Sequence, residues 1–482
     1  MNEQSETPRR IAVIGAGISG LAAAHRLIEL KPEAEIAVFE RDSRLGGVLC
    51  TAHEHGFQVE ASADNFITTV PWGVDLCKRL GLGDQLIQTN PAHRRTYVVR
   101  RRRLHRLPDG FLMMAPTQMW PLAVTPILSP MGKLRAGLEY FIPPKKDDAD
   151  ESMAAFVRRR LGREVFERLV EPLVSAVYAA DMEKLSLLAT LPRFREMERE
   201  HGSLIRAMRH QMATRRKSKA ESGARYSLFL TLRDGLSSMV DAIGGRLPAG
   251  AVRLETTVER IERRGHRWTL SLENGSTEEF DAVIVATPSS TAAQLLEPVD
   301  ADLAGLLAGI AHEGTAIVSV AYRRDQIAHP LDGMGLVVPA IEKSPVLAVS
   351  FSSQKYAHRA PEGTVLLRAF VGGARCPEMA EMRTAELEPL VLGELAVLLG
   401  IRGDPVYRTT SHWPRTMPQY HVGHTQLVDR IESAVARLPR LGLAGNAYRG
   451  VGIPNCIHSG EQAAEHVTLP TRRPGPSGRS LR

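Results

Sequence analysis

The sequence predicts an α/β protein whose first unit is a Rossmann-like dinucleotide-binding fold, made discontinuous by two long inserts. A short β run at 11–14 leads directly into a glycine-rich turn and a helix-forming stretch. Further strand patterns follow near 254–287, and a strand, loop and helix follow near 441–467. The chain has 482 residues, enough for about two to three domains.

The glycine-rich turn has the spacing of a dinucleotide-binding motif. It consists of Gly15, Ala16, Gly17, Ile18, Ser19 and Gly20. Gly15 allows the tight turn, Gly17 lets the backbone approach a pyrophosphate, and Gly20 lets the helix pack closely on the strand. The unpaired N–H groups at the start of the helix then face the phosphates. Three glycines alone are weak evidence, so the surrounding sequence decides.

That surrounding sequence favours a dinucleotide. A second strand at 35–39 ends in Glu40, 20 residues beyond Gly20. A carboxylate at this point accepts hydrogen bonds from the ribose hydroxyls and disfavours a 2′-phosphate. Gly46 and Gly47 follow shortly after. This extension resembles FAD-binding enzymes of the amine oxidase type more than NAD dehydrogenases, so we expect FAD.

Composition excludes several other classes. The net charge of +7 comes from basic residues spread along the chain without a nucleic-acid recognition module, so we expect no nucleic-acid partner and favour a small acidic substrate. The four cysteines form no CxxC pair, and the histidines follow no ligand pattern, so we expect neither disulfides nor a metal. The polar N-terminus lacks a signal-peptide core, which indicates a cytoplasmic protein.

The inserts divide the chain as follows. We expect a discontinuous FAD-binding domain at 1–90, 226–300 and 406–470, a helical insert at 91–225, a β-rich substrate domain with an antiparallel sheet at 301–405, and a disordered tail at 471–482. Helices are predicted at 153–161 and 165–177, and strands at 316–322, 335–338, 346–350 and 364–371.

One stretch of the helical insert has two interpretations. Residues 111–128 are largely apolar, but Pro116, Pro121 and Pro126 would break a membrane-spanning helix. The favoured interpretation is a buried, irregular wall of a pocket. The alternative is a peripheral contact with the inner face of a membrane, because Trp120 and nearby arginines suit an interface.

Several downstream segments extend the resemblance to nearly the whole chain. A buried strand at 279–290 and a strand at 257–261 are similar to those beneath FAD in the same enzymes. A glycine-rich loop at 441–457 precedes a helix. With the runs at 171–192 and 413–420, this pattern resembles the protoporphyrinogen/coproporphyrinogen oxidase family from about residue 10 to 467, most of all the bacterial coproporphyrinogen III oxidases.

The resemblance implies a flavoenzyme of heme biosynthesis. It would oxidise coproporphyrinogen III to coproporphyrin III, return the electrons to O₂ and release H₂O₂, as a monomer or homodimer. Protoporphyrinogen IX stays open as the substrate, and an amine oxidase or a carotenoid desaturase would share the fold. We name no catalytic side chain. Whether a general base exists stays open, because the nitrogen-rich macrocycle can itself assist hydride loss.

The resemblance also assigns site residues. The FAD contacts that it implies, beyond Gly15 to Gly20, Glu40, Gly46 and Gly47, are Arg41, Ser62, Ala63, Asp64, Asn65, Val258, Trp413, Val451, Gly452 and Ile453. Relatives commonly carry glycine where this chain has Ser62 and Ala176, which questions the local backbone. Because propionates want guanidinium partners, Arg95 is the candidate for substrate binding, with Arg100 to Arg103 as a wider basic rim.

Overall fold

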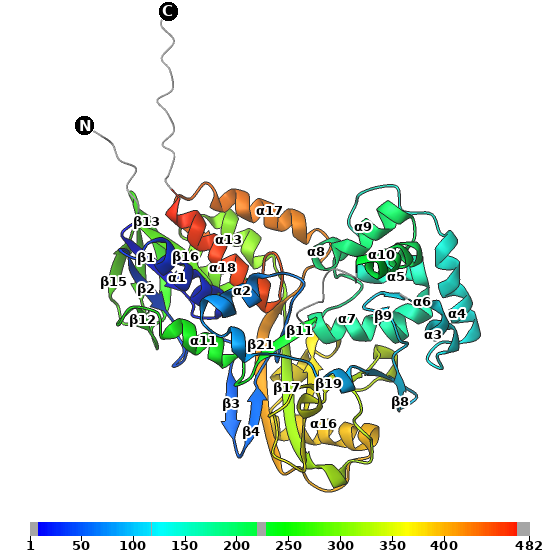
Figure 1. Cartoon of the computed structure of the whole chain (residues 1–482). Coiled ribbons are helices and arrows are strands. Elements are labelled where there is room, and N and C mark those ends of the chain that lie inside the picture. Colours follow the sequence, from blue (N-terminus) through cyan, green and yellow to red (C-terminus); the bar gives the residue numbers. More distant parts are fainter. Residues whose placement is uncertain (1–7, 117, 219–227, 470–482) are drawn as a thin grey trace, which may run out of the picture.

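The computed structural model describes residues 8–116, 118–218 and 228–469. Figure 1 shows a region of parallel strands and helices, a large sheet below it and a group of helices to one side. The predicted tail at 471–482 lies outside the described residues.

The first region contains a five-stranded parallel sheet that collects distant parts of the chain. Its strands are almost wholly buried because helices cover both faces, as all-parallel sheets require. This confirms the predicted discontinuous α/β fold. The strand order is β12 (Val252–Arg253), β2 (Glu35–Phe39), β1 (Arg10–Ile14), β16 (Ala282–Val285) and β22 (Leu441–Leu443).

Each face of this sheet has its own core. Ile11 and Val13 of β1 pack with α1 (Ile18–Leu30), α11 (Ser237–Gly244) and α18 (Ile453–Thr468). The intervening residues Ala12 and Ile14 point to the other face, as strand alternation dictates. That face is covered by α12 (Ser289–Leu296), α13 (Ala301–Ala308), α17 (His424–Val435) and the small antiparallel sheet of β13 (Val258–Arg264), β14 (Arg267–Leu272) and β15 (Thr277–Phe280).

The second region is a seven-stranded sheet, antiparallel except where β18 meets β7. One face packs against α16 (Thr384–Leu399). The four strands predicted between 316 and 371 are present. Three strands of the sheet lie outside the predicted β-rich domain. β7 and β8 come from the range predicted as the helical insert, and β21 comes from the range predicted for the FAD-binding domain. The predicted domain boundaries therefore stay predictions. The order is β21 (Tyr407–Pro418), β17 (His312–Arg323), β20 (Thr364–Gly372), β19 (Val346–Ser350), β18 (Gly335–Val337), β7 (Thr96–Arg100) and β8 (Arg103–Arg106).

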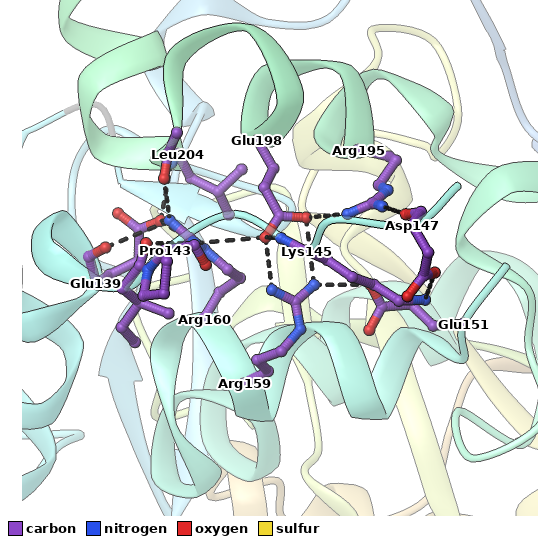
Figure 2. A network of polar contacts seen from close by, with 12 residues as sticks. Glu139, Pro143, Lys145, Asp147, Glu151, Arg159, Arg160, Arg195, Glu198 and Leu204 are labelled. Carbon is purple, nitrogen blue, oxygen red and sulfur yellow. Dashed lines mark hydrogen bonds and ion pairs between the residues drawn. The ribbon is translucent and has the colours of Figure 1, made fainter. Parts of the chain in front are cut away.

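The helical region is held together by a buried ionic network, shown in Figure 2. Arg160 of α5 (Met153–Leu161) and Glu198 of α9 (Pro192–His201) are both fully buried. The Nε atom of Arg160 lies 2.9 Å from Oε1 of Glu139, and the same carboxylate accepts the Leu204 N–H at 2.8 Å, at the start of α10 (Leu204–Ser218). Paired charges of this kind are tolerated in an interior only when their hydrogen bonds are filled.

The stretch at 111–128 is part buried and part exposed. Phe111, Met114 and Leu128 are buried in the core of the helical region. Trp120 and Val124 are 75% and 56% exposed, so both interpretations of the stretch stay predictions. In the described part of the chain, no helix combines the length and the apolar character needed to cross a bilayer.

Candidate functional site

The glycines of the turn between β1 and α1 meet three different requirements. Gly15 has φ +97°, and a Cβ there would lie 2.9 Å from the Ala286 carbonyl oxygen. A Cβ on Gly20 would lie only 1.9 Å from the Gly15 carbonyl oxygen. A Cβ on Gly17 would meet no protein atom within 4 Å. The fold therefore requires Gly15 and Gly20, whereas Gly17 leaves open space that a ligand can use.

Two helices of this region, α1 and α18, begin without a side-chain cap. Gly17 is the N-cap of α1 and Gly452 the N-cap of α18, and neither helix has a capping hydrogen bond. A Cβ on Gly460 would lie 2.1 Å from the Ser19 carbonyl oxygen, so the first turn of α1 packs against the second turn of α18. Free N–H groups and the positive ends of two helix dipoles suit an anionic or electron-rich ligand.

Glu40 lies against the glycine turn. Its Oε2 accepts the Ala16 N–H at 2.7 Å and its Oε1 accepts the Asp42 N–H at 3.0 Å, and only 7% of Glu40 is exposed. The Gly46 N–H donates to the Ala16 carbonyl at 2.9 Å. A Cβ on Gly47, which has φ +57°, would lie 3.2 Å from the Gly17 Cα. The structure thus brings the glycine motif, Glu40 and Gly46-Gly47 together.

Two further residues predicted to contact the nucleotide, Val258 and Arg41, form no hydrogen bond or ion pair with the glycine turn in the described part of the chain. Val258 is 8% exposed and begins β13. The Arg41 side chain is 72% exposed, with its guanidinium 3.7 Å from Asp42. The roles of both residues toward FAD stay predictions.

The loop before α18 is held by a pair of residues to which the sequence analysis gave no role. The Tyr420 hydroxyl donates to the Asn446 carbonyl at 2.5 Å and accepts the Gly450 N–H at 2.9 Å. The His424 ring stacks on Tyr420 with 4.0 Å between centroids, and its Nε2 lies 2.9 Å from the Tyr448 carbonyl. Burial lowers the pKa of His424, so the ring is neutral near pH 7 and Nε2–H is the donor.

The segment at 61–65 lies between the two large sheets. The Trp413 indole on β21 donates to the Ala61 carbonyl at 2.7 Å, so Trp413 and this segment adjoin, as the resemblance implies. Neither Ser62 nor Ala176 has a positive φ, so both fit where relatives carry glycine. Asp64 is partly buried and lies beside Lys355 and Arg368, for which the sequence predicts no role.

Arg95 lies elsewhere. It precedes β7, close to the opposite end of the seven-stranded sheet from Trp413 on β21. Its guanidinium is 2.9 Å from Asp332, and half of its side chain is exposed. The predicted nucleotide contacts thus fall into two groups, one at the glycine turn and one at Trp413 and 61–65, and Arg95 lies at the far side of the sheet from Trp413.

The sequence predicts no metal site. Within residues 8–116, 118–218 and 228–469, no group of three or more His, Cys, Asp or Glu side chains is arranged to hold a metal ion.

A family comparison matches almost the whole chain. The model of the flavin containing amine oxidoreductases covers residues 18–468. The chain belongs to this family. It is therefore a flavin-dependent oxidoreductase with FAD as its cofactor, and the prediction of FAD over NAD is confirmed.

Curated relatives narrow the family to the porphyrinogen oxidases. The chain is 34% identical to a coproporphyrinogen III oxidase of Bacillus subtilis, over 95% of this chain and 98% of the relative. Identity to the coproporphyrinogen III oxidase of Propionibacterium freudenreichii is 35%, over 95% and 90%. A chloroplastic protoporphyrinogen oxidase of Arabidopsis thaliana is 30% identical, over 94% and 87%. The recognised resemblance is confirmed.

Solved structures agree with the fold. A structure named as a protoporphyrinogen oxidase from Exiguobacterium superposes with a TM-score of 0.85 at 30% identity, over 95% of this chain and 98% of that one. A putrescine oxidase superposes with a TM-score of 0.65 at 16% identity, over 95% and 98%. At that identity the second match supports the fold alone.

The residues present fit FAD. Two helix starts have no side-chain cap, and the buried Ser62 Oγ has no hydrogen-bond partner. Gly17 adds open space in which a ligand can lie. The same residues allow the site to be tested without relying on turnover.

We predict opposite behaviour for two neighbouring glycine variants. Gly17→Val fills only open space, so the apoprotein should melt within about 2 °C of the wild type while the Kd for FAD rises at least about tenfold. Gly20→Val places side-chain atoms on the Gly15 carbonyl and should destabilise the protein itself by about 3 kcal/mol or more. Thermal unfolding of the apoproteins and FAD titration measure both. Equal melting points for the two variants would contradict this assignment.

Proposed function

We propose that this protein oxidises coproporphyrinogen III to coproporphyrin III in heme biosynthesis, with O₂ as electron acceptor and H₂O₂ as product. The supporting observation is the pattern of identities. Three bacterial coproporphyrinogen III oxidases are 33% to 35% identical, whereas plant protoporphyrinogen oxidases range from 26% to 30%. The alternative substrate is protoporphyrinogen IX, which has vinyl groups in place of two propionates.

The chain's own residues supply position and charge for this reaction. When bound, the flavin accepts a hydride from the substrate carbon. The uncapped starts of α1 and α18 bind the cofactor's electron-rich groups, and Tyr420 and His424 hold the loop that precedes α18. We assign no general base, since the pyrrole N–H groups of the macrocycle release their protons as it becomes aromatic.

A cavity of about 320 Å³ between the helical region and the seven-stranded sheet is not our candidate for the porphyrinogen pocket. Its carboxylates outnumber its guanidinium groups, which would repel a substrate that carries several propionates. The guanidinium groups are already occupied, one by Glu183 and the other by backbone carbonyls. The charged lining residues are Arg158, Glu167, Glu171, Asp181, Glu183 and Arg375.

We predict that the holoenzyme turns over coproporphyrinogen III with a kcat/KM at least about tenfold above that for protoporphyrinogen IX, equivalent to about 1.4 kcal/mol of transition-state binding. Steady-state oxidation of both substrates under air, with H₂O₂ detected, measures the ratio. Anaerobic mixing is the control, because bleaching of the flavin by neither porphyrinogen would overturn the proposal. A ratio below one would assign protoporphyrinogen IX instead.

Arg95 and Arg106 form a matched pair for the propionate contact. Both guanidinium groups bind the same carboxylate, Asp332, at 2.9 and 3.1 Å. If Arg95 binds a propionate, Arg95→Ala should raise the KM for coproporphyrinogen III about tenfold, with kcat little changed, because a charge-assisted hydrogen bond contributes about 1.5–3 kcal/mol. Arg106→Ala should leave KM within about twofold. An unchanged KM in Arg95→Ala would remove this residue from the substrate site.

We further propose that an exposed apolar face of the helical region contacts the membrane surface. The face consists of Trp120, Val124, Met131, Leu134, Leu138 and Phe141. Trp120 and Phe141 are each 75% exposed, and α3 (Met119–Val124) and α4 (Pro130–Gly137) lie at the outer edge of the molecule in Figure 1.

A nearby cation and a rigid backbone support the proposal that this face contacts a membrane surface. The exposed Arg206 lies over the Tyr140 ring at 4.2 Å, next to Phe141, so a cation accompanies the aromatic side chains and suits an anionic headgroup. Glu139, two residues before Phe141, is anchored in the buried network of Figure 2. That network fixes the segment that presents Leu138 and Phe141 outward.

We predict that the protein floats with vesicles containing anionic phosphatidylglycerol and that Trp120→Ser with Phe141→Ser abolishes flotation without changing kcat. Removing two exposed aromatic side chains takes away several kcal/mol of apolar burial. Leu390→Ser is the control, since Leu390 is 47% exposed on α16. Failure of the wild type to float would contradict the proposal, as would a dimer in solution that the double variant dissociates.

A further inference from the structure

A group of charged side chains, three buried and two partly buried, lies where the seven-stranded sheet meets the segment at 61–65. The group, which we call the seam cluster, consists of Glu60, Asp64, Lys355, Arg359 and Arg368. Arg359 and Arg368 are 2% and 1% exposed. The Lys355 Nζ lies 3.0 Å from Asp64 Oδ1, and the Arg368 Nη1 lies 3.5 Å from Asp64 Oδ2. None of the contacts described above gives these charges a function.

The seam cluster carries a surplus of positive charge. Its three cations face two carboxylates. Glu60 accepts the Leu236 N–H at 3.0 Å and the Thr51 hydroxyl at 2.8 Å, and burial raises the pKa of Glu60. Burial alone would also raise the pKa of Asp64, but the nearby charges of Lys355 and Arg368 lower it. The seam cluster is therefore cationic even when both carboxylates are ionised.

Arg368 retains donors that the folded protein does not use. Its Nη2 donates to the Ser62 carbonyl, whereas its Nε and Nη1 have no hydrogen-bond partner, and neither has the Ser62 Oγ. Burying a guanidinium group with free donors is costly, so such donors in a native interior call for an acceptor. The described part of the chain offers only Asp64, 3.5 Å from Nη1, so a full set of acceptors would need a bound molecule.

The neighbours of Arg368 indicate which molecule this is. Trp413 of β21 binds the Ala61 carbonyl and Arg368 of β20 binds the next one, at Ser62. Two adjacent peptide units of the segment that the family resemblance assigns to the flavin are thus held by β20 and β21, the two strands on either side of β17. FAD is the cofactor of this family, and its ring carries acceptor atoms and gains negative charge on reduction.

We propose that Arg368 and Lys355 are positioning residues that raise the reduction potential of the bound flavin, with Asp64 as the counter-charge that limits the effect. A fixed cation in a site without bulk water stabilises the charge gained on reduction, and a fixed carboxylate opposes it. This inference concerns the flavin alone and does not depend on which porphyrinogen is oxidised.

The test is a redox equilibrium between holoenzyme and a reference dye, driven by xanthine and xanthine oxidase without porphyrinogen. Arg368→Gln and Lys355→Met should each shift the equilibrium toward oxidised flavin at least about tenfold, which is about 30 mV for a two-electron couple. Asp64→Asn should shift it the opposite way by a similar factor. Arg368→Lys keeps the charge and should stay within about threefold of the wild type.

The opposite signs separate an electrostatic role from a structural one. Arg375→Gln is the control, because the Arg375 guanidinium is held by the Val338 and Ser344 carbonyls, both at 2.9 Å, and should leave the equilibrium unchanged. FAD content and thermal unfolding are measured for every variant. If Arg368→Gln fails to retain FAD, Lys355→Met and Asp64→Asn decide the result. Shifts in the same direction, or no shift in either, would overturn the proposal.

Discussion

The site depends on the close contact between α1 and α18, the first and last long helices of the described chain. Their backbones approach so closely that a Cβ on Gly460 would lie 2.1 Å from the Ser19 carbonyl oxygen. Both helices begin at a glycine with no side-chain cap, so each start leaves backbone N–H groups free for a ligand. Because these helices come from opposite ends of the sequence, the cofactor site forms only when both ends of the chain have come together.

A second junction connects this nucleotide fold to the sheet that would face the substrate. The bonds from Trp413 and Arg368 to successive carbonyls at Ala61 and Ser62 fasten the segment at 61–65 to β21 and β20. Arg359 extends the same junction, since its guanidinium donates to the Leu232 and Arg233 carbonyls at 3.0 and 2.9 Å. The two domains therefore share polar bonds at the place where the flavin is expected, and a change there affects both.

The sequence predicts this site well where the requirement is local. The glycines of the turn follow from backbone geometry, and their spacing is visible without any partner. Glu40 is also predictable, although its hydrogen bond to the Ala16 N–H is seen only in the structure. Arg368 and Lys355 are not predictable, because each lies in an ordinary stretch and meets Asp64 from about 300 residues away. No spacing rule links residues that only the packing of two sheets brings together.

The net positive charge is a second feature of the sequence that predicts the site poorly. The many basic residues of the sequence favour an acidic substrate, yet Arg160, Arg195, Arg359 and Arg368 are all less than 10% exposed. The guanidinium groups of these arginines bind carboxylates and backbone carbonyls inside the protein. Even in the arginine-rich run, Arg102 binds Glu394 at 3.1 Å. The net charge of the sequence therefore overstates how many basic side chains are available to a substrate. In the seam cluster, by contrast, we propose that the surplus positive charge acts on the cofactor.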